Sequence, residues 1–213
     1  SLKFNRDSLL LYAVTDSSWL KGGTLEEAVR QAVSGGATCV QLREKHLPPQ
    51  QLEELARRVK QVTDAYGVPL IINDSVSIAR AVDAAGVHIG QEDCSVQEAR
   101  RILGPDKVIG VSARSVQQAQ LAQSQGANYL GVGAVFGTTT KADAKPLSRQ
   151  MLREIAQSVT IPAVAIGGIN ECNIKELACC GIAGVAVVSA LFAQPDIAAA
   201  AYNLHQLAEG IVK

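Results

Sequence analysis

Short apolar runs alternate with longer amphipathic stretches along the whole chain. The runs are rich in β-branched residues, as buried strands are, and they cover residues 9–16, 38–45, 69–75, 86–93, 108–113, 128–136, 162–169 and 184–192. Between them, stretches such as TLEEAVRQAVSGG place apolar residues three or four positions apart, and this spacing predicts helices. The pattern therefore predicts a strand followed by a helix, repeated eight times.

This repeat indicates an α/β fold with parallel strands, because parallel neighbours need a crossover helix between them. Eight units in 213 residues predict a single closed (β/α)8 TIM barrel. An open doubly wound sheet is the alternative, and the uninterrupted repeat favours closure. No linker or shift in composition divides the chain, so we expect residues 1–213 to form one barrel domain.

The composition does not favour nucleic acid or a membrane as a partner. Lys plus Arg and Asp plus Glu both number 20, so no net charge favours nucleic acid or a membrane surface. No apolar run reaches the roughly 18 residues of a membrane span, and the start SLKFNRDS lacks the apolar core of a signal peptide. We therefore expect a cytoplasmic protein that acts on small molecules. The five cysteines and three histidines have no zinc-ligand spacing, and we expect most of the cysteines to be buried.

Polar residues gather at the carboxyl ends of the predicted strands. In a TIM barrel, the active site lies at this end of the strands. In the segment 131–145, an apolar run is followed by three threonines and a lysine. A solvated turn is the simple explanation, and a phosphate or pyrophosphate site is the alternative. Gln41, Arg43 and Lys45 are spaced two apart, so on a strand they would face one side and suit a polyanion. A solvated strand end would also explain them.

Asp74 and Asp93 end the predicted third and fourth strands, which are neighbours in the barrel. Two carboxylates at one mouth repel each other unless a cation lies between them, and Mg²⁺ prefers such hard oxygen ligands. Alternatively, Asp93 caps the next helix. Ser95 can take that role, with Glu98 three residues later, so we favour the magnesium site.

Glycines and a serine follow the last two predicted strands. Gly167, Gly168 and the Val188-Ser189 turn lie where phosphate sites of TIM barrels commonly form. Tight packing alone could explain the glycines, but together with the other groups they indicate a phosphate-bearing ligand. By contrast, we expect His88 to be a hydrogen-bonded barrel residue rather than a catalyst.

The ordered set of runs resembles the thiamine-phosphate synthase (thiamine-phosphate pyrophosphorylase) family over nearly the whole chain. The motifs are YAVTD, QLREK, IINDS, GVHIGQED, GVSA, YLGVGAVFGTTTK, IPAVAIGGI and GVAVVSALF. The resemblance implies a transferase that condenses 4-amino-2-methyl-5-hydroxymethylpyrimidine diphosphate with 4-methyl-5-(2-phosphoethyl)thiazole, in its plain or carboxylated form. The products are thiamine phosphate and pyrophosphate. It also implies Mg²⁺ bound by Asp74 and Asp93.

The resemblance assigns the remaining site residues. Positions that hold the pyrimidine and its diphosphate match Gln41, Arg43, Lys45, Asn73, Ser112 and Lys141. Positions around the thiazole phosphate match Thr138, Thr139, Thr140, Gly168, Val188 and Ser189. Of these, the candidate catalytic residues are Arg43, Lys45, Ser112 and Lys141. The family reaction is described as dissociative and needs no side-chain nucleophile, and the sequence shows no Ser-His-Asp arrangement near the mouth.

Two positions depart from the family pattern, and two other functions compete with the synthase. Family members often have Arg where this chain has Ser75, and Pro where it has Gly137, which should loosen the threonine loop. A related thiazole tautomerase would not need Asp74, Asp93 and Lys141. A barrel that binds thiamine phosphate without turnover is the other alternative. A homodimer is compatible with the sequence.

Overall fold

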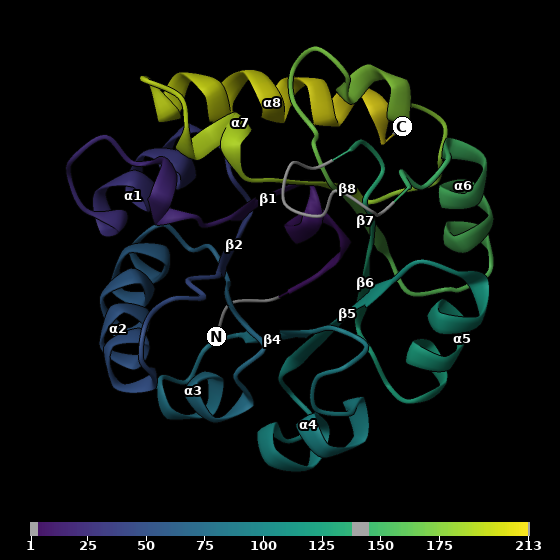
Figure 1. Ribbon diagram of the computed structural model, residues 1–213, viewed down its shortest axis with the longest axis horizontal. Helices are drawn as coiled ribbons and strands as arrows, with labels where there is room; N and C mark the ends of the chain where they lie inside the picture. Colours follow the sequence, from purple (N-terminus) through teal and green to yellow (C-terminus); the bar gives the residue numbers. More distant parts are fainter. Residues whose placement is uncertain (1–3, 138–144, 213) are drawn as a thin grey trace.

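A closed barrel of parallel strands forms the centre of the protein. The computed structural model describes residues 4–137 and 145–212, and over these residues the barrel has eight strands in sequence order. They are β1 (Leu11–Val14), β2 (Cys39–Leu42), β3 (Leu70–Asn73), β4 (Gly86–Ile89), β5 (Val108–Ala113), β6 (Tyr129–Gly133), β7 (Ala163–Ile166) and β8 (Gly184–Val187). Pairing of β1 with β8 closes the ring, which confirms the predicted (β/α)8 fold (Figure 1).

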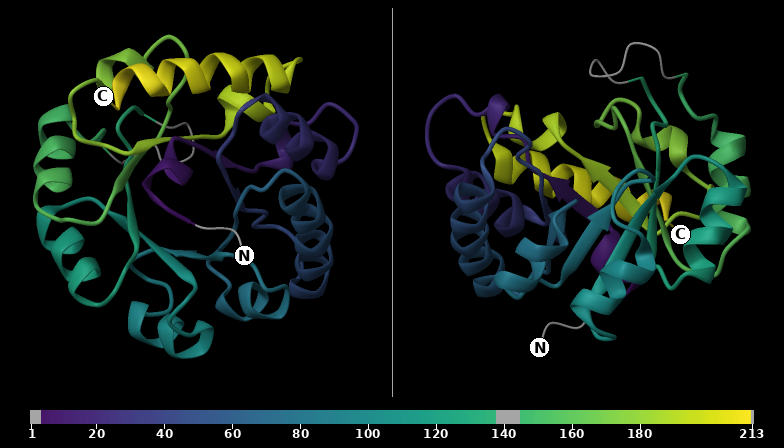
Figure 2. Two further views of the ribbon diagram at one scale, coloured as in Figure 1. Left: turned by 180° about the vertical axis from the view of Figure 1, so that it is seen from behind. Right: turned by 60° about the horizontal axis from the view of Figure 1, so that its bottom comes forward.

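Helices surround the strands on the outside (Figure 1 and Figure 2). They are α1 (Leu25–Gly35), α2 (Pro49–Ala65), α3 (Val76–Ala81), α4 (Val96–Leu103), α5 (Val116–Ser124), α6 (Arg149–Gln157), α7 (Ser189–Phe192) and α8 (Ile197–Ile211). The described residues also form the 3-10 helices η1 (Arg6–Leu9), η2 (Ser17–Trp19) and η3 (Ile174–Leu177). The strict repeat is broken once, because η3 stands where a full helix was expected between β7 and β8. The short α7 precedes the covering helix α8.

Polar side chains begin most of these helices. At six helices, the side chain of the residue before the helix accepts a hydrogen bond from a backbone N–H in the first turn. These residues are Thr24, Ser75, Ser95, Ser115, Ser148 and Asp196. Such caps satisfy donors that the helix itself leaves free. These caps therefore stabilise the first turns of the helices that follow them.

The strands are shorter than the apolar runs predicted. β2 ends at Leu42 and β4 at Ile89, so the polar residues that follow belong to loops. The expectation that Gln41, Arg43 and Lys45 lie on one side of a strand is therefore wrong. Gln41 is buried inside the barrel, whereas Arg43 and Lys45 are exposed beyond the strand end.

Apolar side chains fill two layers. The larger one lies between the strands and the helices, and the smaller one fills the barrel interior around Tyr12, Ile71 and Tyr129. η1 packs beneath β1 and β8, with Leu9 fully buried. A side chain at Gly184 would overlap the carbonyl oxygen of Leu9, so glycine there permits this close contact.

The structure contradicts one smaller expectation, which concerns the cysteines. The five cysteines are free, and only Cys39 and Cys180 are buried, while Cys172 and Cys179 are exposed, so the expectation that most are buried is wrong. None of the helices in residues 4–137 and 145–212 has the length and apolar character that a membrane crossing requires.

Candidate active site

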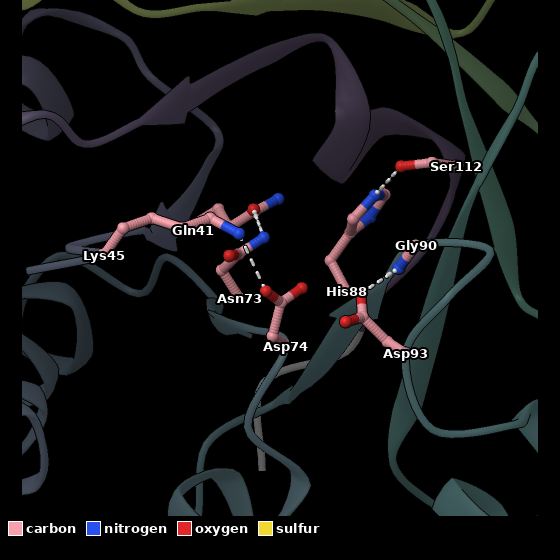
Figure 3. A network of polar contacts seen from close by, with 8 residues as sticks. All are labelled: Gln41, Lys45, Asn73, Asp74, His88, Gly90, Asp93 and Ser112. Atoms are coloured by element: carbon pink, nitrogen blue, oxygen red, sulfur yellow. Dashed lines mark hydrogen bonds and ion pairs between the residues drawn. The ribbon is translucent and has the colours of Figure 1, made fainter. Parts of the chain in front are cut away.

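An ion pair stands at the carboxyl ends of β2 and β3 (Figure 3). Nζ of Lys45 donates a hydrogen bond to Oδ2 of Asp74 at 2.9 Å. The two side chains keep 49% and 37% of their surface exposed, so solvent screens the attraction. Exposed pairs of this kind contribute only about 0–1 kcal/mol to stability. Either partner can therefore exchange to a ligand at small cost.

The backbone at Asp74 adopts a conformation that few residues other than glycine take. Its φ is +63°, in the left-handed region, where Asp and Asn are the best tolerated of the other residues. Its N–H donates to the carbonyl oxygen of His88 at 2.8 Å, which ties the end of β3 to β4. Local strain of this kind gathers at functional sites.

Asp93 is held in the turn after β4 and not at the start of α4. Its Oδ2 accepts a hydrogen bond from the Gly90 N–H at 2.7 Å. Ser95 is the N-cap of α4 and accepts from the Glu98 N–H at 3.1 Å, so the alternative of Asp93 as helix cap is wrong. Glu92, the residue before Asp93, is exposed.

The two carboxylates face the same space. In Figure 3, the oxygen that each aspartate leaves out of these hydrogen bonds points toward the other carboxylate. Across residues 4–137 and 145–212, no cluster of three or more His, Cys, Asp or Glu side chains could hold a metal ion. A cation between Asp74 and Asp93 would therefore take its other ligands from water and substrate.

Deeper in the barrel, polar side chains are bonded to one another. Asn73 Nδ2 donates to Gln41 Oε1 at 2.8 Å, and Gln41 Nε2 donates to the Tyr12 hydroxyl at 2.9 Å. On the other side, Nε2 of His88 lies 2.8 Å from Oγ of Ser112. Gln41, Asn73 and Ser112, which the family resemblance assigned to the pyrimidine, thus belong to one interior layer.

His88 is buried among these groups, with 8% of its surface exposed. Burial lowers the pKa of its imidazole to about 4, although the nearby charge of Asp93 acts in the opposite direction. The imidazole is therefore neutral at physiological pH. This confirms His88 as a hydrogen-bonded barrel residue.

The low pKa of His88 predicts a loss of stability in mild acid. The unfolded chain binds a proton at His88 near pH 6.5 and the folded protein only near pH 4, so this contribution is complete above pH 6.5 and falls as the pH falls. Lowering the pH from about 6.5 to about 4 should therefore lower the free energy of unfolding by on the order of 3 kcal/mol. Urea unfolding across pH 4–7 measures the loss, with His88→Gln as the comparison. An equal slope in the variant would refute the assignment.

The loops after β7 and β8 form the other side of the mouth. Gly167 and Gly168 have φ values of +111° and +62°, which side chains resist. A Cβ at Gly168 would lie 2.9 Å from the Gly137 carbonyl oxygen, so glycine lets the two loops approach. Val188 precedes α7, and Ser189 is its first residue. Both loops lie at the carboxyl end of the barrel, as predicted.

The threonine run and its lysine, Thr138, Thr139, Thr140 and Lys141, lie outside the described residues. The residues around them are tied to β5. Arg114 donates to the carbonyl oxygens of Gly133 and Lys145 at 2.9 and 3.0 Å. Arg114 was not among the candidate site residues, because nothing in its spacing along the chain marks it. Ser75, one of the departures, is the N-cap of α3.

Sequence reasoning also missed the two interior tyrosines. Tyr12 and Tyr129 are fully buried and their hydroxyls lie 2.6 Å apart. A side chain at Gly110 would overlap the Tyr129 ring, and one at Gly131 would approach the His88 ring to 3.0 Å. For Tyr129 the available signal was its pairing with a glycine, Gly110, in the neighbouring strand.

The chain is similar in sequence to one protein family and to its members. The family model described as thiamine monophosphate synthase matches residues 11–191. A thiamine-phosphate synthase of Ruminiclostridium cellulolyticum is 51% identical over 197 residues, which cover 92% of this chain and 94% of that protein. The thiamine-phosphate synthase of Clostridium tetani is 48% identical over 194 residues, covering 91% and 93%.

A solved structure agrees over almost the whole fold. It is described as thiamine phosphate pyrophosphorylase from Pyrococcus furiosus and is 39% identical in sequence. The TM-score is 0.90, and the match covers 98% of this chain and 99% of that one.

Proposed function

The chain belongs to the thiamine monophosphate synthase family and is an enzyme of the transferase type; on this premise, we propose that it condenses the pyrimidine diphosphate with the thiazole phosphate and releases pyrophosphate. The observation that carries the proposal is the two-sided mouth. Asp74, Asp93 and Lys45 stand on one side, and the open turns at Gly168 and Ser189 stand on the other. Two phosphate-bearing substrates would then meet between them.

The donors on the first side fit Mg²⁺. Asp74 and Asp93 offer hard oxygens, and each has one oxygen outside the hydrogen bonds described above. Mg²⁺ is commonly held by one or two carboxylates together with water and substrate phosphates, so a third carboxylate is not required. When bound, the ion would supply positive charge that neutralises the leaving diphosphate.

Residues of the chain itself would bind and neutralise the pyrimidine diphosphate. Lys45 can exchange its weak contact with Asp74 for a diphosphate oxygen, and the exposed Arg43 adds a forked donor beside it. The layer of Gln41, Asn73 and Ser112 lies beneath them to hold the pyrimidine ring. Lys141 is proposed for the same diphosphate.

The second side would hold the thiazole phosphate. Backbone N–H groups of Gly168, Val188 and Ser189 would donate to the phosphate, and Gly168 has no side chain to obstruct its approach. Thr138, Thr139 and Thr140 are proposed as further donors. The bond from the pyrimidine methylene carbon to the diphosphate oxygen would break, the oxygen keeping the electron pair, and the thiazole nitrogen would give its lone pair to that carbon.

In this dissociative scheme the protein positions the two substrates and supplies no nucleophile. Holding the two rings in line and excluding water would supply much of the rate. The thiazole tautomerase is less well supported, because it leaves Asp74 and Asp93 without a role. One barrel domain over residues 1–213, a cytoplasmic location and a homodimer stay predictions.

Pyrophosphate release from purified protein tests the function. We expect release only when both substrates and Mg²⁺ are present, with none from either substrate alone. Binding of the thiazole phosphate or of thiamine phosphate without any release would instead indicate the tautomerase or the non-catalytic barrel.

A further inference from the structure

Six polar side chains from six different strands form an unbroken line of hydrogen bonds through the barrel. The line begins with the contacts Asn73 to Gln41 and Gln41 to Tyr12, at 2.8 and 2.9 Å. It continues from Tyr12 to Tyr129 at 2.6 Å and from Tyr129 to Nδ1 of His88 at 2.9 Å. It ends with Nε2 of His88 and Ser112, at 2.8 Å. Both of its ends lie at the mouth.

The orientation of the Gln41 amide sets the direction of this line, and the number of hydrogens carries that direction from one group to the next. The Tyr12 hydroxyl accepts from Gln41 Nε2, so its one hydrogen goes to its other partner, Tyr129. Tyr129 has then accepted one hydrogen bond, and its own hydrogen goes to Nδ1 of His88. A hydroxyl offers one donor, so neither tyrosine can donate both ways.

The same count sets the tautomer of His88. Because Nδ1 accepts a hydrogen bond from Tyr129, it carries no hydrogen, and the ring hydrogen is on Nε2. Nε2 therefore donates to Ser112 Oγ. Ser112 receives a hydrogen bond from inside the barrel and keeps its own hydroxyl hydrogen for another partner.

We propose that this one-way line makes Ser112 a donor and Asn73 an acceptor toward the substrate, with Tyr12, Tyr129 and His88 as positioning residues. The identity of the substrate rests on the proposed function. Ser112 would donate to a ring nitrogen or a diphosphate oxygen of the pyrimidine diphosphate. Asn73, whose Nδ2 is engaged with Gln41, would turn Oδ1 to the amino group of the ring.

The packing around the line resists any rearrangement. Tyr12, Tyr129 and His88 are buried. Gly110 leaves no more than the space that the Tyr129 ring needs, and Gly131 does the same for the His88 ring. Within the described residues, every buried side-chain nitrogen and oxygen has a hydrogen-bond partner. Reversing one hydrogen would therefore require reversing all of them, which is why the order can discriminate between ligands.

The tautomer of His88 tests the direction without any substrate. The chain has three histidines, so ¹⁵N NMR of the intact protein near pH 7 gives few ring signals, and His46→Gln and His205→Gln assign the other two. We expect the hydrogen of His88 on Nε2. A hydrogen on Nδ1 would mean that Ser112 donates inward, and the proposal would be wrong even if the enzyme is active.

A kinetic split tests the consequence for binding. Tyr129→Phe removes the central link, so the KM for the pyrimidine diphosphate should rise at least about ten-fold. The KM for the thiazole phosphate should change less than about two-fold. Tyr202→Phe is the matched control, since Tyr202 is 64% exposed. An equal change in both KM values, or no change in either, would overturn the positioning role.

Discussion

Asp93→Asn should lower kcat/KM for pyrophosphate release by about 100- to 1,000-fold, the effect of losing roughly 3–4 kcal/mol of charge stabilisation in the transition state. Asparagine keeps an oxygen that can accept from the Gly90 N–H, so the turn after β4 should stay in place. The loss would then report the missing negative charge. Initial rates across a series of Mg²⁺ concentrations measure it, and the Mg²⁺ requirement should rise.

The neighbouring residue supplies the control. Glu92 is exposed and one position away, and Glu92→Gln removes the same charge from the same loop. Its rates should stay within about two-fold of the parent protein, as for most surface substitutions. If Asp93→Asn kept full activity at low Mg²⁺, the carboxylate would have no part in metal binding.

Lys45→Gln should lower kcat/KM by about 100-fold, mainly through a higher KM for the pyrimidine diphosphate. The substitution removes a charge-assisted contact of about 1.5–3 kcal/mol, and it also leaves Asp74 without its ion-pair partner. Lys45→Arg should restore part of the activity, because it returns the charge with a different geometry. Steady-state kinetics with each substrate varied in turn separates the two KM values.

Lys60→Gln is the matched control for this change. Lys60 forms an ion pair with Asp64 within α2 at 2.8 Å, with no role in the proposed site. The control should leave both KM values unchanged. A rise in the KM for the thiazole phosphate alone in Lys45→Gln would contradict the assignment of Lys45 to the diphosphate.

The barrel could be predicted because its signal is periodic. Each parallel strand is buried on both faces and therefore reads as a continuous apolar run, and each covering helix repeats at three or four residues. The connection between β7 and β8 did not follow the rule, since η3 is a short 3-10 helix. Strand ends were also misjudged: alternation carried past Leu42 placed Arg43 and Lys45 on a strand that had already ended.

Asp74 and Asp93 could be placed from the sequence because carboxyl ends of neighbouring parallel strands meet at one edge. Their mutual orientation depends on the left-handed φ of Asp74 and on the Gly90 contact, and neither is encoded in residue spacing. The interior line through Tyr12 and Tyr129 was missed for a similar reason. Those residues are 117 positions apart, and only barrel closure brings their hydroxyls together.

The most direct test of the proposed site is a crystal structure with Mn²⁺ in place of Mg²⁺ and with pyrophosphate and the pyrimidine bound. Anomalous scattering locates the metal independently of any assumption about its ligands. We expect a peak within coordination distance of both Asp74 and Asp93, with the diphosphate oxygens beside it. A metal bound elsewhere, or a diphosphate bound by Arg43 and Lys45 with no metal at the two aspartates, would contradict it.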